Sequence, residues 1–171
     1  LWSYTTEGES NEGPRQIAIS ADGEYIVAGT EYYEDCCGDR GKLYLFDKDS
    51  STPLWIYNTT DNANTVAISA DGDYIVVGDG DYKVTLFHKS SSTPLWVYTT
   101  QDWMRSVAIS ADGEYVVAGS HDYKFYLFDK DSSTPLWSYY TGDYVYSVAI
   151  SEDGEYITVG GGGNQVYLFD K

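Results

Sequence analysis

The chain has little of several residue types, and each scarcity excludes a class of protein. Its 171 residues include only two cysteines, four prolines and one methionine. Two adjacent cysteines cannot supply the network of crosslinks on which small disulfide-rich domains depend. No apolar run approaches the roughly 18 residues that a membrane-spanning helix needs. The 17 glycines follow no collagen-like period.

Positive charge is equally scarce. Ten Lys and Arg residues stand against 27 Asp and Glu residues, which gives a net charge of −17 at pH 7. A surface of this charge repels phosphate backbones and anionic lipids. We therefore expect no nucleic-acid partner and no membrane insertion. What the chain does have is 18 tyrosines with many Val, Ile and Thr residues, and these suit a pleated, half-buried surface. This composition predicts an all-β protein.

Three motifs recur in a fixed order along the chain. Residues 66–100 and 107–141 are identical at 24 of 35 aligned positions, so the chain is a tandem repeat of about 41 residues. The motifs are Leu-Trp-x-Tyr, beginning at 1, 54, 95 and 136, Ala-Ile-Ser-x-Asp-Gly, beginning at 18, 67, 108 and 149, and Leu-Phe-Asp or Leu-Phe-His, beginning at 45, 86, 127 and 168.

Each repeat has the pattern of four strands. In the first repeat, Ile17–Ser20 and Glu24–Gly29 alternate around Asp22-Gly23, a dipeptide that favours a tight hairpin turn. Segments such as Lys83–Phe87 form a third strand, and the Leu-Trp-x-Tyr motif forms a fourth. The second and third strands are apolar on both faces, so each sheet must be covered on both sides. Sheets stacked between like sheets meet this requirement.

The repeat resembles two related families. The segment Trp103–Gly113, followed by Val117–Ser120 and Leu127–Asp129, is similar to a WD40 repeat. The Leu-Trp-x-Tyr strand resembles the PQQ-type repeat of quinoproteins, and similar hybrids occur in microbial surface-layer proteins. The resemblance implies a four-bladed β-propeller with four antiparallel strands per blade. We expect residues 1–171 to form a single domain.

The order of the motifs suggests how the ring closes. The chain starts with a fourth-strand motif, and its last repeat lacks one. We therefore expect the N-terminal strand, Leu1, Trp2, Ser3 and Tyr4, to complete the last blade, since closure removes open sheet edges. Three alternatives remain: two chains forming one eight-bladed ring, a piece of a larger propeller, or a polymer linked by exchanged strands. A start at Leu1 is consistent with a processed product or a fragment.

The first repeat carries two insertions, at residues 7–14 and 31–42. In a propeller blade the two connections that they lengthen emerge at the same end, so we expect them side by side on one rim. Loops carry function more often than the scaffold beneath them, although a tolerated surface insertion is the alternative.

The longer insertion contains both cysteines, Cys36 and Cys37, close to Tyr32 and Tyr33. The cysteines form a vicinal disulfide of the kind found beside the cofactor in quinoprotein dehydrogenases, a covalent link to another subunit, or two free thiols. We predict oxidised cysteines at an interface, which suits an extracellular protein.

Clustered carboxylates provide a weak calcium site, because Ca²⁺ takes oxygen ligands. A solvated acidic surface is the alternative for all of them. The candidates are Glu31, Glu34, Asp35, Asp39, Asp79 and Asp81.

No catalytic arrangement is visible. The two histidines, His88 and His121, fall in different repeats, so we predict neither a Ser-His-Asp triad nor a two-His metal centre. We predict no cofactor apart from the possible calcium.

The functional prediction is a non-enzymatic structural or interaction propeller at the cell surface or outside the cell. Its expected partners are copies of itself, assembled into a fibre or a surface layer. Its acidity implies that assembly needs divalent cations, high salt or strand exchange. The alternatives are a ligand-binding propeller, lectin-like or related to quinone-cofactor proteins, and a fragment of a larger propeller.

Overall fold

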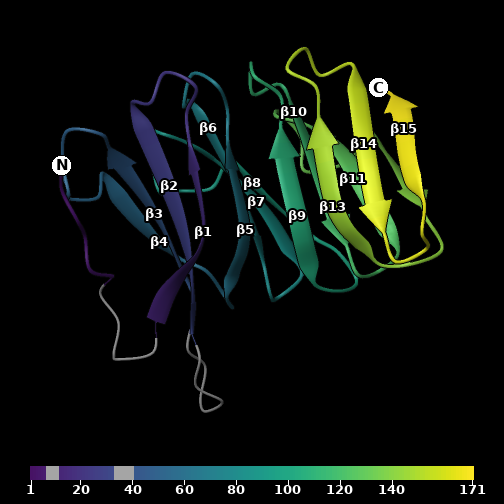
Figure 1. Cartoon of the computed structure of the whole chain (residues 1–171), viewed down its shortest axis with the longest axis horizontal. Helices are drawn as coiled ribbons and strands as arrows, with labels where there is room; N and C mark the ends of the chain where they lie inside the picture. The colour runs from purple at the N-terminus through teal and green to yellow at the C-terminus, as the bar shows by residue number, and fades with distance from the viewer. Residues whose placement is uncertain (7–11, 33–40) are drawn as a thin grey trace.

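A computed structural model describes residues 1–6, 12–32 and 41–171, and within these ranges the chain forms fifteen strands and no helix (Figure 1). The strands make four antiparallel sheets, which we call blades 1 to 4. Blade 1 contains β1 (Glu12–Ile19), β2 (Tyr25–Tyr32), β3 (Lys42–Asp47) and β4 (Trp55–Asn58). Blade 2 contains β5 (Ala63–Ile68), β6 (Tyr74–Asp79), β7 (Lys83–His88) and β8 (Trp96–Thr99). Blade 3 contains β9 (Met104–Ile109), β10 (Tyr115–Ser120), β11 (Lys124–Asp129) and β12 (Trp137–Tyr140). Blade 4 contains β13 (Val145–Ile150), β14 (Tyr156–Gly161) and β15 (Val166–Asp170). The all-β fold of repeated propeller blades is confirmed.

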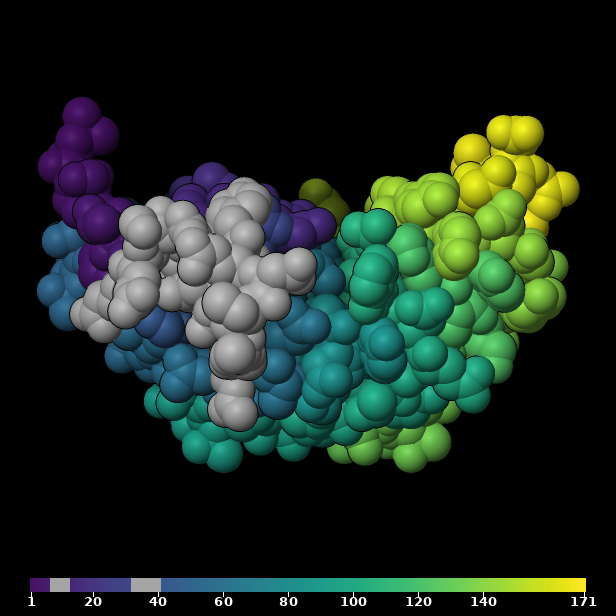
Figure 2. All heavy atoms as spheres, turned by 90° about the horizontal axis from the view of Figure 1, so that it is seen from below, coloured from purple at the N-terminus to yellow at the C-terminus, as the bar shows by residue number. Residues whose placement is uncertain are grey.

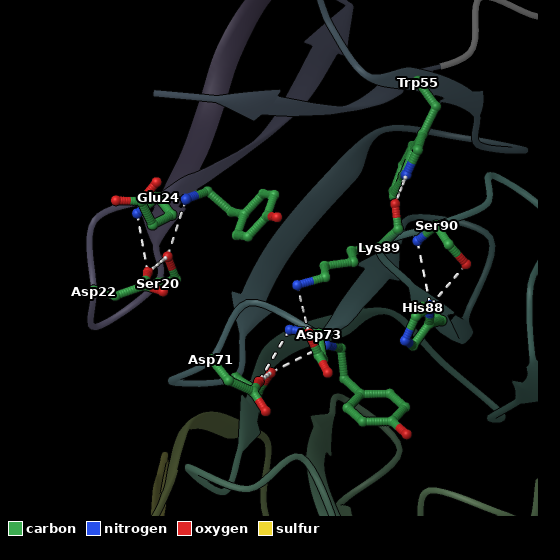
Figure 3. Close-up of polar contacts among 12 residues, drawn as sticks. Ser20, Asp22, Glu24, Trp55, Asp71, Asp73, His88, Lys89 and Ser90 are labelled. Atoms are coloured by element: carbon green, nitrogen blue, oxygen red, sulfur yellow. Dashed lines mark hydrogen bonds and ion pairs between the residues drawn. The ribbon is translucent and has the colours of Figure 1, made fainter. Parts of the chain in front are cut away.

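The hairpin between the first two strands of each blade is fixed by its own side chains. In blade 1, Ser20 Oγ donates to Asp22 Oδ1 at 2.5 Å and accepts a hydrogen bond from Tyr25 N at 3.0 Å, while Asp22 Oδ1 accepts one from Glu24 N at 2.9 Å (Figure 3). Gly23 and its counterparts in the other blades all have φ of +74°, a conformation that glycine adopts without a steric penalty. The predicted turns are therefore confirmed.

The hydrophobic core lies between blades rather than inside any one of them. Leu43 and Leu45 of blade 1 pack with Ile75 and Phe87 of blade 2, and all four are fully buried. Equivalent clusters join blade 2 to blade 3 and blade 3 to blade 4. The second and third strands are covered on both faces because each blade is sandwiched by its neighbours.

The repeated tryptophan of the fourth strand joins consecutive blades. Trp55 of β4 packs its ring against Phe87 of the next blade, with centroids 5.5 Å apart, and its Nε1–H donates to Lys89 O at 2.8 Å (Figure 3). Trp96 makes the same hydrogen bond to Lys130 O at 2.8 Å. Lys89 also reaches back to Asp73 of its own blade, with Nζ and Oδ1 2.6 Å apart.

The N-terminal strand does not complete the last blade, contrary to the prediction from the order of the motifs. The last sheet contains only β13, β14 and β15, so residues 1–6 do not complete it. They lie instead on blade 1, where Trp2 Nε1 donates to Lys48 O at 2.6 Å and Tyr4 packs edge-on against Phe46 at 5.2 Å. These contacts reproduce those that Trp55 and Tyr57 make with the following blade. Residues 1–6 therefore occupy the place of the fourth strand of a preceding blade.

The four blades form an open crescent. The two chain termini lie at opposite ends of the row of blades in Figure 1, and Figure 2 shows a hollow between the two ends. The first strands, β1, β5, β9 and β13, pack against one another in order along the crescent. The ring predicted for one chain is therefore not closed.

Candidate functional site: the loop rim of the blades

One edge of the crescent is built from the connections that vary most between repeats. We call it the loop rim. It consists of the segments entering the first strand of each blade and those joining the second strand to the third. Its described part forms the lower edge of Figure 1 and faces the viewer in Figure 2. The opposite edge carries the repeated Asp-Gly turns, which we call the turn rim.

A repeated Thr-x-Asp sequence holds each segment that enters a first strand. Thr100 Oγ1 lies 2.8 Å from Tyr82 O and 2.7 Å from Asp102 O, and Asp102 Oδ1 accepts a hydrogen bond from Trp103 N at 2.8 Å. The same three contacts occur in the neighbouring blades, with Thr59 and Asp61 in one and Thr141 and Asp143 in the other. We call this arrangement the Thr-x-Asp brace.

The residues just after the Asp differ among the three described braces. The position after the Asp is Asn62, Trp103 or Tyr144, and the position two residues further is Asn64, Arg105 or Tyr146. The hydrogen bonds of the brace fix the backbone of the loop in each case. The side chains at the two variable positions therefore differ at the surface while the loop keeps its conformation. Variation on a fixed scaffold is typical of a binding surface.

Three blades contribute to a hollow on this rim. Its volume is about 180 Å³, and its walls carry both described arginines together with an exposed tryptophan. The lining residues are Arg15, Asp61, Asn62, Asn64, Gly80, Trp103 and Arg105.

Arg105 is held in place by two neighbours. Its Nε–H donates to His121 Nε2 at 2.8 Å, and its guanidinium carbon lies 6.0 Å from the centre of the Trp103 ring. Burial, assisted by the positive charge of Arg105, lowers the pKa of His121. The imidazole is therefore neutral at pH 7 and accepts the hydrogen bond. The stacked guanidinium keeps its remaining N–H groups in a fixed plane.

Aromatic rings continue along the rim beyond the hollow. The ring of His121 lies 4.3 Å from that of Tyr144, and Tyr144 lies 5.2 Å from Tyr123. Half of Trp103 and of Tyr146 is exposed, at 50% and 51%. Exposed rings gathered in this way provide a surface suited to stacking.

A second hollow of about 250 Å³ lies on the turn rim between blades 2 and 3. Its walls include Tyr74, Trp96 and Lys130, which recur at the same positions in other repeats. It is therefore mainly part of the general contact between blades, and His88, which replaces the aspartate of the other three repeats, is the lining residue specific to blade 2.

The insertions lie next to each other where the structure describes them. Glu12 pairs with Tyr32 and Gly13 with Glu31, which makes the β1–β2 hairpin longer than its counterparts. The expected juxtaposition on one rim is confirmed for these ends. The following predicted residues lie outside the described ranges: Tyr33, Glu34, Asp35, Cys36, Cys37 and Asp39.

The described calcium candidates have protein partners. Glu31 forms an ion pair with Arg15, and Asp81 Oδ2 pairs with Lys83 Nζ at 2.5 Å. Asp79 is buried, and its Oδ1 accepts hydrogen bonds from Asp81 N at 3.1 Å and Lys83 N at 2.9 Å. Burial raises the pKa of Asp79. Among the described residues no three acidic, histidine or cysteine side chains are grouped to hold a metal ion.

The family follows from comparison with known proteins. Residues 39–171 match the model of a PQQ-repeat family described as outer membrane protein assembly factor BamB. The chain belongs to this family. The match covers blades 2 to 4 and strands β3 and β4 of blade 1, so the resemblance to PQQ-type repeats is confirmed. No curated protein matches the chain.

Membership of the BamB family gives the coarse function. The fold is a β-propeller of the interaction type, and the family is named for an assembly factor, not for an enzyme. No helix in the described ranges is long and apolar enough to cross a membrane.

Proposed function

We propose that the chain is a non-enzymatic extracellular propeller that assembles head to tail with copies of itself. The observation that carries this proposal is the complementarity of the two ends of the crescent. Each end exposes one half of a contact that occurs three times inside the chain.

The internal contact has a backbone part and a side-chain part. Ala21 N donates to Ala70 O, Ala70 N to Ala111 O, and Ala111 N to Glu152 O, at 2.9 to 3.0 Å. A tyrosine of each blade also lies against the turn glycine of the next, as Tyr115 does against Gly154. Successive blades thus bind each other through one repeated set of atoms.

Blade 1 exposes the receiving half of this contact. Ile17 is 68% exposed, whereas its counterparts Val66, Val107 and Val148 are at most 7% exposed because a preceding blade covers them. No described residue lies within 4 Å of the position that a Cβ would take on Gly23, although a tyrosine covers each equivalent glycine.

Blade 4 exposes the other half. Tyr156, the counterpart of Tyr115, is 51% exposed. Leu168 is 68% exposed, although the same position is fully buried in the three preceding blades. The outer edge of β15 also lacks a fourth strand in the described part of the chain.

A second copy supplies what each end lacks. The register of β11 with β12 pairs Leu127 with Trp137, and the same register pairs Leu168 of one copy with Trp2 of the next. Residues 1–6 would then complete blade 4 of the neighbour by strand addition while keeping their contacts to their own blade 1. Because both ends of the crescent face its open side (Figure 2), the same contact made twice closes a ring of two copies. Eight blades lie within the usual range of about 4–8 for propellers.

The decisive experiment compares the mass of the purified protein over a range of concentrations, by light scattering after size exclusion, with electron micrographs of the same samples. We expect rings of two copies, or filaments if the ends do not close. Ile17→Asp and Leu168→Asp each place a charge in the proposed contact and should release monomers. Leu95→Asp is the matched control, because Leu95 is 51% exposed but belongs to neither end. A monomer at every concentration, or assembly that ignores both end variants, contradicts the proposal.

A further inference from the structure

We infer that the hollow between Asn64, Trp103 and Arg105 on the loop rim is a binding site for a neutral sugar ring. This inference is independent of head-to-tail assembly. It rests on the size of the hollow, on the exposed indole and on the mixture of polar groups around it.

The size favours one small ligand. About 180 Å³ is less than the roughly 300 Å³ at which pockets for drug-sized molecules begin. Three separate blades line this volume, through Arg15, Asn64 and Arg105. A ligand held there touches elements that the blade contacts keep rigid.

The indole of Trp103 provides the apolar part of the site. It differs from the other four tryptophans, which recur in the Leu-Trp-x-Tyr motif, and it is half exposed at the wall of the hollow. Its backbone is fixed by the Thr-x-Asp brace and its ring by Arg105. The flat C–H face of a pyranose covers such a ring with little loss of conformational entropy, because the ring is already held.

The polar groups supply both donors and acceptors. Arg105 donates Nε–H to His121, and no carboxylate among the described residues forms an ion pair with it. Asn64 contributes an amide, with its Nδ2 3.5 Å from Met104 O, and Asp61 contributes a carboxylate. Planar guanidinium, amide and carboxylate groups bind neighbouring hydroxyls two at a time.

The charge of the site favours a neutral ligand over an acidic one. Arg15 is neutralised by Glu31, and the carboxylate of Asp61 lines the same hollow as the guanidinium of Arg105. The whole chain has a net charge of −17, so an anionic sugar meets general repulsion without a surplus of local positive charge.

The test is titration with a panel of methyl glycosides of glucose, galactose, mannose, xylose and N-acetylglucosamine, followed by the indole N–H signals in nitrogen-15 spectra. We expect at least one glycoside to shift the Trp103 signal, identified with Trp103→Phe. The signals of Trp55 and Trp96, whose N–H groups are bonded to carbonyls, should stay unchanged. Trp103→Ala and Arg105→Lys should each weaken binding at least about tenfold.

Tyr140→Ala is the matched control, because Tyr140 is a 60% exposed aromatic on the same rim but outside the hollow. Melting curves establish that every variant is folded. No shift with any glycoside, equal binding by the Trp103→Ala protein, or tighter binding of glucuronate than of methyl glucoside overturns the inference.

Discussion

The indole N–H of Trp2 donates to the backbone oxygen of Lys48 at 2.6 Å, although no sheet in the described chain contains Trp2. The same bond joins Trp55 to Lys89 and Trp96 to Lys130, each time from the fourth strand of one blade to the next blade. At the N-terminal end of the described chain, the tryptophan segment alone therefore makes the same contact with the next blade.

The first prediction compares two tryptophans that make the same hydrogen bond. Trp96→Phe removes the bond to Lys130 O at a nearly buried site and should lower the free energy of unfolding by about 1–2 kcal/mol. In the dispersed protein, Trp2→Phe should cost less than half as much, because Trp2 of the single chain is 38% exposed. Urea denaturation of both variants measures the difference, and equal losses would contradict this account.

A second prediction concerns the turn glycines. Gly23→Ala and Gly113→Ala both force a side chain into a positive φ, at a cost of about 1–2 kcal/mol. Gly113→Ala adds a collision with the ring of Tyr74, so it should destabilise the dispersed protein more than Gly23→Ala does. Thermal unfolding at low protein concentration tests the order. If Gly23→Ala also prevents assembly at high concentration, this indicates that Tyr156 of a second copy covers Gly23.

The third prediction follows from Asp79. Its pKa is raised above the ordinary value of 3.8, so the folded state holds the proton more tightly than the unfolded chain does. The free energy of unfolding therefore increases as pH falls from neutral through the raised pKa towards 3.8. Asp79→Asn keeps an oxygen acceptor and removes the titration. The variant should be more stable than the wild type at pH 7, by on the order of 1 kcal/mol, and should lose this advantage on acidification. Ser120→Ala, changed at the equivalent position of blade 3, is a control that should leave the pH dependence unaltered.

The fourth prediction uses the net charge. Contacts between copies of a chain with charge −17 should strengthen with sodium chloride, since the screening length falls from about 10 Å at 0.1 M to about 3 Å at 1 M. Sedimentation at several salt concentrations measures this. If a chelator dissolves the assemblies at constant ionic strength, a divalent cation bridges the copies; if it has no effect, screening or strand addition suffices.

The fifth prediction addresses Cys36 and Cys37. If they form a vicinal disulfide, the mass measured without reductant is lower by about 2 Da, since two hydrogens are lost. A covalent dimer that reductant separates identifies a link between subunits. Recovery of the full reduced mass from protein secreted into an oxidising medium contradicts the prediction that these cysteines are oxidised.

The sequence predicts the blades well because their causes are local or repeated. The Asp-Gly turns depend on conformations that few residues adopt, and Gly23 adopts the expected one. The tryptophans of the fourth strands recur at one place in each unit, which correctly indicates packing between blades. Closure of the ring is different. The motif order predicts three strands for the last blade of the given sequence, but every blade contact is chemically alike, so the sequence does not specify which segment completes that sheet.

The insertions of the first repeat indicate the loop rim in the sequence, but the hollow on this rim is not predicted. Trp103 belongs to a segment that resembles a family motif, and alignment of the repeats emphasises what they share. The positions that differ between repeats are more informative: Thr100 and Asp102 recur in the other repeats, while the residues next to them change. The hollow forms where three blades meet, and Arg15, Asn64 and Arg105 each come from a different blade. No local sequence pattern shows that these distant residues lie close together.

The Thr-x-Asp brace separates the architecture of the chain from its recognition chemistry. Because each brace uses only its own hydroxyl and carboxylate together with nearby backbone groups, the side chains at the two variable positions after it can change while the brace stays the same. Repeats that are identical after duplication can then acquire different surfaces through a few substitutions. The same property makes the crescent a practical scaffold for selecting new specificities from libraries.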